Sequence, residues 1–449
     1  MHNPYLCPPM RSELIATLRL SIPIIITNMA QIALGLIDSA MVGAISYKQL
    51  AASSLAINVI SIPQIICIGL TMAISPLVAI ARGRQDAVTA SRALYNGVWL
   101  NAGLTLLVAI GCVAGSPLLH SLGQDPEVAT MAVPYFSIMA WSLIPMIIFL
   151  SVKQFSDALE MTKTGMVLAL ATLPLNFFLN WVFIYGKLGL PRMELYGAGV
   201  ATLITRILSA VVMIIIVLYH PAYKRYIAAR RQAWHIKGKQ LGELLHIGIP
   251  SGMQYAMEAG AFALSGIMVG WLGATAQAAH QIALNIASFS FMAALGLSLG
   301  GSIRVSHAYG RGDRPLMRRI GISTIYGGIA YGIFCVTYFV LLRFQLPLIF
   351  TKEPAVITMA ASLLFLAAIF QISDSTQAIG VGLLRGIRDV KVPTLLVAIA
   401  YWGIGIPGGY WLAFNQGMGA AGIWLGLVLG LTASSVLCNW RFLRKTRVL

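Results

Sequence analysis

Apolar runs long enough to cross a lipid bilayer follow one another along almost the whole chain. A helix that spans the hydrocarbon core needs about 20 apolar residues. Such runs lie near residues 14–43, 50–80, 94–121, 128–153, 164–187, 196–220, 241–272, 277–307, 320–348, 354–384, 392–414 and 417–440. Lipid offers no partner to unpaired backbone groups, so each run is predicted to be helical. The sequence therefore predicts an all-α membrane protein with about 12 transmembrane helices.

Charge is too scarce in this chain for a water-soluble surface. Only 10% of the 449 residues are charged, whereas soluble domains carry about 25%. The formal net charge is +17, which in a soluble protein would suggest nucleic-acid binding. In a membrane protein the same excess is typical of Lys and Arg in cytoplasmic loops. We expect membrane lipid around the chain and no nucleic-acid partner.

The distribution of Lys and Arg between alternate loops predicts the orientation. With the N-terminus inside, 25 of the 31 Lys and Arg residues fall in cytoplasmic segments. The opposite side holds five of them, Lys48, Lys187, Arg192, Arg343 and Lys352. This bias predicts a multi-pass protein of the bacterial inner membrane with both termini in the cytoplasm.

An internal repeat relates the two halves of the chain. Residues 21–86 align with 248–313 without a gap at a shift of 227, with 18 identities in 66 positions. Pro23 matches Pro250 in this alignment. Proline is not one of the common apolar residues of the spans, so this match does not follow from shared apolar composition. Six spans in each half give both halves the same orientation, so the repeat is parallel, about an axis along the membrane normal.

We therefore predict two parallel six-helix repeats that form a V-shaped, two-lobe transporter. The amino-terminal lobe is expected to comprise residues 1–220 and the carboxy-terminal lobe residues 241–449, joined by a basic cytoplasmic linker, 221–240. A substrate site is expected between the lobes near the midplane, where rocking of one lobe against the other gives alternating access.

Three acidic residues, Asp38, Glu258 and Asp374, lie well inside apolar spans. A charge at the bilayer centre costs roughly 2.5–3.5 kcal/mol on insertion scales, so such an acid predicts a functional site. Helical spacing places polar residues near each acid on the same face of its span. The residues expected to line a cavity with these acids are Gln31, Gln254, Ser265, Phe370 and Gln377.

The chemistry of these residues suits a small cation. Asn176 and Asn180 are one turn apart in the fifth span, and amide and carboxylate oxygens are ligands that hard cations such as Na⁺ prefer. A buried carboxyl group can also carry a proton. The residues alone leave Na⁺ and H⁺ open as the coupling ion. No GxxxxGK[ST], GxSxG or HExxH motif occurs, so we expect no other cofactor, no direct use of ATP and no enzyme activity.

Other residues within the spans allow two interpretations. Arg206 is the one Lys or Arg deep in an apolar run, and it is expected to snorkel or to pair with an acid at a span end. His280 is expected at the interface rather than as a proton carrier. Pro23 and Pro250 kink their helices, as static bends or as hinges.

Three segments resemble the multidrug and toxic compound extrusion (MATE) transporters, in particular the NorM-like branch. They are Asp-Ser-Ala-Met-Val-Gly at 38–43, Pro-Leu-Asn-Phe-Phe-Leu-Asn at 174–180 and Asp-Ser-Thr-Gln at 374–377. The resemblance implies an amino-lobe site for Na⁺ or H⁺ and a carboxy-lobe site for the same ions. The implied amino-lobe residues are Asp38, Asn176, Asn180 and Thr202. The implied carboxy-lobe residues are Glu258 and Asp374.

One position departs from the family pattern. NorM-like members often carry a tyrosine one turn before the aspartate of the tenth span, and this chain has Phe370. A hydroxyl ligand from that position is therefore missing, which weakens the case for Na⁺ in the carboxy lobe and favours protons there.

The function that these observations predict is secondary multidrug efflux. The protein, acting as a monomer, would export cationic amphipathic molecules from the cell in exchange for Na⁺ or H⁺. A flippase for lipid-linked oligosaccharides, from the related superfamily, is the alternative, although an anionic pyrophosphate would need several Arg or Lys residues in the cavity. A membrane-embedded enzyme is a more remote alternative, and so is a channel.

Overall fold

The computed structural model describes residues 10–228, 233 and 237–447, so Arg230 and Arg231 of the predicted linker lie outside it. All secondary structure in this described part is helical. The first half contains α1 (Met10–Gly43), α2 (Tyr47–Thr71), α3 (Ile74–Gly83), α4 (Ala87–Gly115), α5 (Pro126–Ala158), α6 (Thr162–Tyr185), α7 (Glu194–Tyr219) and α8 (Lys224–Ala228). The second half contains α10 (Gly238–Gly270), α11 (Ala274–Arg311), α12 (Arg314–Leu342), α13 (Pro354–Gly386), α14 (Lys391–Ala398), η4 (Ile399–Gly405), α15 (Ile406–Tyr410), η5 (Trp411–Asn415) and α16 (Gly419–Lys445).

Most of these helices are long and apolar enough to cross a membrane. Within the described ranges, 11 helical segments meet that criterion, and one of them joins α2 to α3 while another runs from α14 through η5. Helix α10 has 33 residues, but Gln254 and Glu258 interrupt its apolar sequence. The prediction of an all-α fold with about 12 membrane-spanning helices is confirmed.

The chain divides into two compact units. The amino unit comprises Ile26–Gly252, and the carboxy unit comprises Met1–Ile25 and Met253–Leu449. The chain passes from one unit to the other inside α1, two residues after Pro23, and inside α10, two residues after Pro250. These two points are 227 residues apart. The units therefore divide at equivalent positions of the repeat, and each contains the first part of the other half's leading helix. The lobe boundaries at 220 and 241 stay a prediction.

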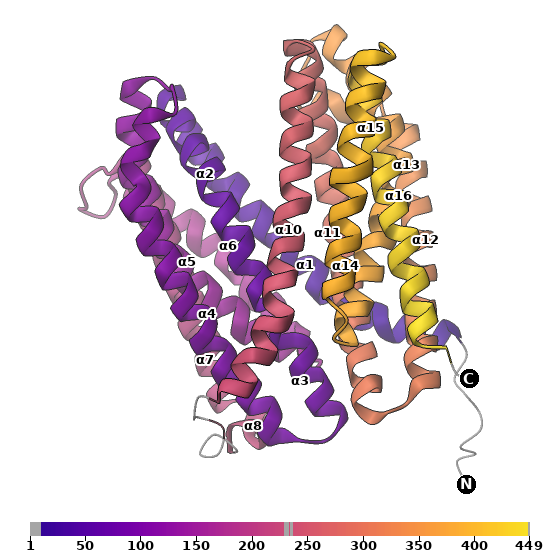
Figure 1. Ribbon diagram of the computed structural model, residues 1–449. Coiled ribbons are helices and arrows are strands. Elements are labelled where there is room, and N and C mark those ends of the chain that lie inside the picture. Colours follow the sequence, from indigo (N-terminus) through magenta and orange to yellow (C-terminus); the bar gives the residue numbers. More distant parts are fainter. Residues whose placement is uncertain (1–9, 229–232, 234–236, 448–449) are drawn as a thin grey trace. The chain divides into compact units, whose positions relative to one another are not determined.

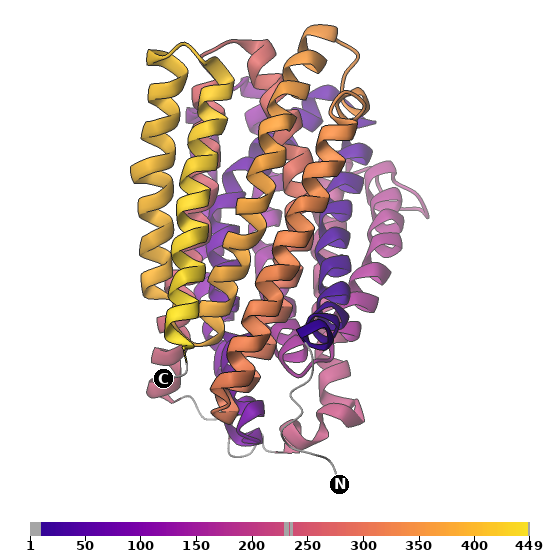
Figure 2. The same ribbon diagram turned by 90° about the vertical axis from the view of Figure 1, so that its right-hand side faces the viewer.

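The repeat extends through both halves at the same shift. Helix α12 begins and ends 227 residues after α4, and α13 begins one residue beyond the position that this shift gives for α5. Helix α5 packs against α2, α4 and α7 in the amino unit, as α13 packs against α11, α12 and α16 in the carboxy unit. Figures 1 and 2 both show α12, α13 and α16 side by side. The same helix of each repeat is thus the centre of its unit.

Two acids matched by the repeat cap equivalent helices. Asp86 Oδ1 accepts a hydrogen bond from the Thr89 amide at 2.9 Å at the start of α4, and Asp313 Oδ1 accepts one from the Leu316 amide at 2.9 Å at the start of α12. Partial burial raises the pKa of Asp86, but hydrogen bonds from Thr89 outweigh it, so that pKa lies below its ordinary value. These acids satisfy helix ends.

Small residues let helices approach closely within each unit. In the amino unit a Cβ atom on Gly69 of α2 would overlap the backbone of Gly252 in α10. In the carboxy unit a Cβ atom on Gly296 of α11 would overlap Ile25 in α1. Gly69 and Gly296 are equivalent in the repeat, as are Ile25 and Gly252. Such contacts are typical of membrane helices, where close backbone packing replaces a hydrophobic driving force.

Proline also shapes one predicted span. The run near 50–80 forms two helices, with a break at Met72 and Ala73 before α3 begins. Pro76 follows this break and cannot donate a hydrogen bond to the Met72 carbonyl, which favours the interruption.

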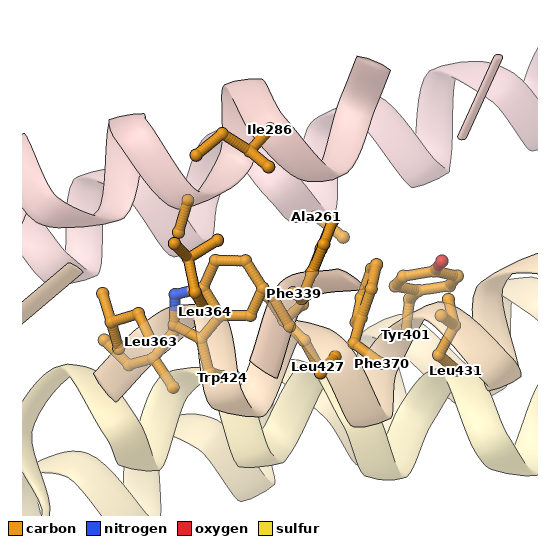
Figure 3. Close-up of a cluster of buried hydrophobic side chains, with 14 of the residues drawn as sticks. Ala261, Ile286, Phe339, Leu363, Leu364, Phe370, Tyr401, Trp424, Leu427 and Leu431 are labelled. Atoms are coloured by element: carbon orange, nitrogen blue, oxygen red, sulfur yellow. The ribbon is translucent and has the colours of Figure 1, made fainter. Parts of the chain in front are cut away.

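The interior of the carboxy unit is rich in aromatic side chains. Figure 3 shows Trp424, Phe370 and Tyr401 among the buried apolar residues. The indole Nε1 of Trp424 donates a hydrogen bond to His280 Nδ1 at 3.1 Å. His280 is only 2% exposed, because Trp424 packs against the imidazole. Its predicted position at the membrane interface stays a prediction.

Candidate ion-binding sites

The amino cluster, which we define as Asp38, Asn176, Asn180 and Thr202, joins three helices of the amino unit. Asp38 Oδ1 accepts a hydrogen bond from Asn180 Nδ2 at 2.6 Å, and Asp38 Oδ2 accepts one from Thr202 Oγ1 at 3.0 Å. Asn180 Nδ2 also donates to Asn176 Oδ1 at 3.1 Å. The structure thus brings together the four residues that the resemblance implied for this lobe.

Helical spacing explains how the cluster forms. Asn176 and Asn180 lie four residues apart in α6, so both point to one face of that helix. Asp38 comes from α1 and Thr202 from α7. Asp38 is 8% exposed, and the other three residues are almost completely buried. A buried carboxylate needs a compensating positive charge or a proton, because leaving it unpaired costs several kcal/mol.

One oxygen of the amino cluster is suited to an additional ligand. Asn180 Oδ1 is buried and accepts no hydrogen bond from the part of the chain that the structure describes. A buried acceptor without a partner is unfavourable by roughly 1–3 kcal/mol. Together with Asp38 and the Asn176 amide, it provides the oxygen-rich surroundings that Na⁺ prefers. The same carboxylate could hold a proton instead, so the geometry fits both ions.

Arg206 lies beside the amino cluster. Its Nη1 donates to Ser142 Oγ at 2.7 Å, and its charge acts on Asp38. Arg206, Thr202 and Gln31 line a cavity of about 140 Å³. The acid on which Arg206 acts is thus Asp38 of α1, and the predicted snorkelling of Arg206 stays a prediction. The sequence offered no signal for Ser142, because serine is common in membrane helices.

The carboxy cluster, which we define as Gln254, Glu258, Asp374 and Gln377, joins α10 and α13. Glu258 Oε1 accepts hydrogen bonds from Gln254 Nε2 at 3.0 Å and from Gln377 Nε2 at 2.8 Å. Asp374 is close enough to Glu258 for their charges to interact, and it is 7% exposed. Two nearby carboxylates cannot both be ionised without cost, so a shared proton or a bound cation stabilises them.

Two residues predicted to line the carboxy-lobe cavity lie inside the packed helices instead. Ser265 is 0% exposed, and its hydroxyl donates to the Ala261 carbonyl of its own helix at 2.8 Å. Phe370 is 2% exposed and packs edge-to-face against Phe262 and Trp424. Their spacing placed both residues on the face of an acid, but neighbouring helices cover them.

Asp389, in the loop between α13 and α14, has a structural role. Asp389 accepts hydrogen bonds from Arg441 Nε at 2.7 Å and pairs with Lys445 Nζ at 2.9 Å. Partial burial raises the pKa of Asp389, but these two basic groups outweigh it and hold that pKa below its ordinary value. The contacts fasten the end of α16 to the loop that follows α13.

The fold and its repeat define a multi-pass helical membrane protein built from two related halves. The MatE family model matches the chain twice, over residues 23–182 and 250–411. The two matches begin 227 residues apart, at Pro23 and Pro250, which is the shift of the internal repeat. The chain belongs to the MatE family.

Bacterial relatives cover nearly all of the chain. The probable multidrug resistance protein NorM of Rhizobium meliloti (strain 1021) is 36% identical over 437 residues, which cover 96% of this chain and 93% of that protein. The multidrug resistance protein NorM of Burkholderia vietnamiensis is 33% identical over 445 residues, which cover 98% and 96%. The resemblance to the NorM-like branch is confirmed.

Solved structures share the fold at lower identity. The eukaryotic MATE transporter AtDTX14 superposes with a TM-score of 0.87 at 20% identity, over 98% of this chain and 99% of that chain. A MOP superfamily transporter from Pyrococcus furiosus Vc1 superposes with a TM-score of 0.88 at 19% identity, over 97% and 96%. The reverse polarity of that protein's binding pocket suggests a different function for it. Cargo must therefore be argued from side chains, because one fold hosts several functions.

Proposed function

We propose that this chain is a secondary multidrug efflux antiporter that exports organic cations in exchange for Na⁺ or H⁺ by alternating access. The observation that supports this most is that each compact unit holds a carboxylate cluster inside its membrane-spanning helices. Acids at such depth are costly and are typical of ion or proton pathways. The relatives named multidrug resistance protein support the same proposal.

Competition between ion and cargo is sufficient for exchange. In the carboxy cluster, a bound proton or Na⁺ cancels one unit of the negative charge that Glu258 and Asp374 present to a cationic cargo. Loss of the ion restores that charge. Two ligands that compete for one site need no long-range signal to be coupled, because each lowers the apparent affinity of the other.

The sign of the buried charges supports a cationic cargo. Three acids lie inside the spans, whereas Arg206 is the one basic residue deep in an apolar run. Asp38 and Arg206 offset each other in the amino unit. In the carboxy unit the buried Arg385 acts on Glu258, so two acids there face one basic group and an excess of negative charge remains. A flippase for an anionic pyrophosphate would need the opposite balance. We therefore place organic cations ahead of that alternative, and transport ahead of catalysis.

Cellular accumulation of a fluorescent cation tests the proposal. Expression in a bacterial strain without its own efflux pumps should lower the steady-state ethidium content of the cells. An ionophore that collapses both the proton and the sodium gradient should abolish the difference. An effect of expression that survives full collapse of both gradients would contradict ion-coupled efflux.

Cysteine labelling tests the proposed orientation in the bacterial inner membrane. In an otherwise cysteine-free chain, a cysteine at Lys224 should resist a membrane-impermeant maleimide in intact cells, and one at Gly123 should react. The reason is that Lys and Arg favour the cytoplasmic side. Reversed labelling would overturn the cytoplasmic placement of both termini and the direction of export.

A further inference from the structure

A segment of π-helix lies in the carboxy unit. Residues Ile399–Gly405 form η4, between α14 and α15. π-Helical turns are rare and occur frequently at functional sites, because the extra residue in the turn redirects side chains. No residue of η4 was among those predicted for a site.

The π-helix packs against the turn of α10 that carries Glu258. Trp402 Nε1 donates a hydrogen bond to the Met257 carbonyl at 3.2 Å. A Cβ atom on Gly260 would lie 3.3 Å from the Trp402 ring. Met257 and Gly260 flank Glu258 in the sequence, so these contacts hold η4 at the height of this acid.

Tyr401 precedes Trp402 and points into the interior of the unit. It is 1% exposed. Phe262 contacts both Tyr401 and Phe370: its ring centroid is 6.0 Å from that of Tyr401 and 5.9 Å from that of Phe370, both edge-to-face. Figure 3 shows Phe370 and Tyr401 next to each other. Phe262 follows Glu258 by one turn, and Phe370 precedes Asp374 by one turn, so Tyr401 lies among the neighbours of both acids.

The phenol of Tyr401 is suited to the carboxy cluster. Both Glu258 and Asp374 are close enough for their charges to act on the Tyr401 hydroxyl. Two side-chain hydrogen bonds of this cluster end on Glu258 Oε1, from Gln254 and Gln377. A buried phenol usually has a polar partner. A cation between the hydroxyl and the carboxylates would satisfy all three groups.

We propose that the Tyr401 hydroxyl is the neutral oxygen ligand of the ion site formed by Glu258 and Asp374, placed there by the π-helix η4. The inference rests on the proposed ion coupling and adds a residue to it. It also supplies, from a different helix, an aromatic hydroxyl that Phe370 lacks. A neutral ligand alongside two acids is what a Na⁺ site needs, whereas a site that binds protons alone needs none.

The test is the ion dependence of transport by Tyr401→Phe. Ethidium transport by the purified protein in liposomes would be measured over a range of imposed Na⁺ concentrations at fixed pH. A second series would be measured over a range of pH without Na⁺. Tyr401→Phe should raise the Na⁺ concentration for half-maximal transport about tenfold, because a hydroxyl bound to a charged group is lost. The pH series should change less. Tyr410→Phe is the matched control, since Tyr410 is 49% exposed and packs on Phe414.

A second substitution separates the hydroxyl from general packing. Phe370→Tyr places a phenol on the second ring that packs against Phe262, one turn before Asp374. Tyr401→Phe combined with Phe370→Tyr should therefore regain most of the wild-type Na⁺ dependence. Unchanged Na⁺ dependence in Tyr401→Phe, an equal change in Tyr410→Phe, or a double variant as impaired as the single one would each overturn the inference. Wild-type protein that responds to neither ion would overturn the proposed function itself, and the inference with it.

Discussion

Replacing Asp38 by asparagine should abolish ion-driven export while the protein is still made and inserted. The amide has nearly the size of the carboxylate but lacks its charge, so it can neither hold a proton nor balance Na⁺. It also sets an NH₂ group against Asn180 or Thr202, which both donate to Asp38. We expect efflux to fall by more than about tenfold, because charged hydrogen bonds of this kind contribute roughly 1.5–3 kcal/mol each. The measurement is ethidium efflux at matched expression.

A matched control uses another aspartate of the same half. Asp86→Asn changes an acid that caps α4, and asparagine caps helices about as well. This variant should transport as the wild type does. Wild-type efflux by a normally expressed Asp38→Asn protein would show that the amino cluster is not needed for coupling.

The second large effect is expected from the carboxy cluster. Glu258→Gln should weaken coupling and shift the dependence of transport on pH or Na⁺. The amide still accepts from Gln254 and Gln377, so the loss reports the charge rather than the fold. Asp374→Asn should have a similar effect alone. Because the charges of the two acids interact, the second substitution should add much less in the presence of the first.

A double-mutant comparison measures this dependence. Efflux rates of the wild type, both single variants and the double variant are compared at matched expression. The control is Glu353→Gln, because Glu353 immediately precedes α13. Independent sites give additive changes in free energy, and residues of one site do not. Fully additive losses would mean that Glu258 and Asp374 do not share a coupling ion.

The helices could be predicted from the sequence because lipid allows few alternatives. Each predicted span corresponds to helical structure, and the rarity of acids inside spans identified Asp38, Glu258 and Asp374 before any contact was known. Asn176 and Asn180 followed from helical spacing. These are properties of single helices, so a single sequence suffices for them.

What could not be predicted depends on neighbouring helices. Spacing places Ser265 on the face of an acid, but packing covers it. The hydrogen bond from Trp424 to the buried His280 also joins two helices that are far apart in the sequence. Thr202 was expected only from the family resemblance, and the proximity of Arg206 to Asp38 was not expected. The π-helix around Tyr401 leaves no periodic signal, because apolar residues surround it on all sides in the sequence.

The most direct test of the central claim is transport by the purified protein in liposomes without ATP. A fluorescent organic cation is placed outside, and a Na⁺ gradient or a pH gradient is imposed separately across the same vesicles. If the protein is an antiporter, a higher concentration of at least one of the two ions inside the vesicles should drive uptake of the organic cation. Reversing that ion gradient should reverse the movement of the cation. Cation movement that is equally fast with and without either gradient would contradict antiport.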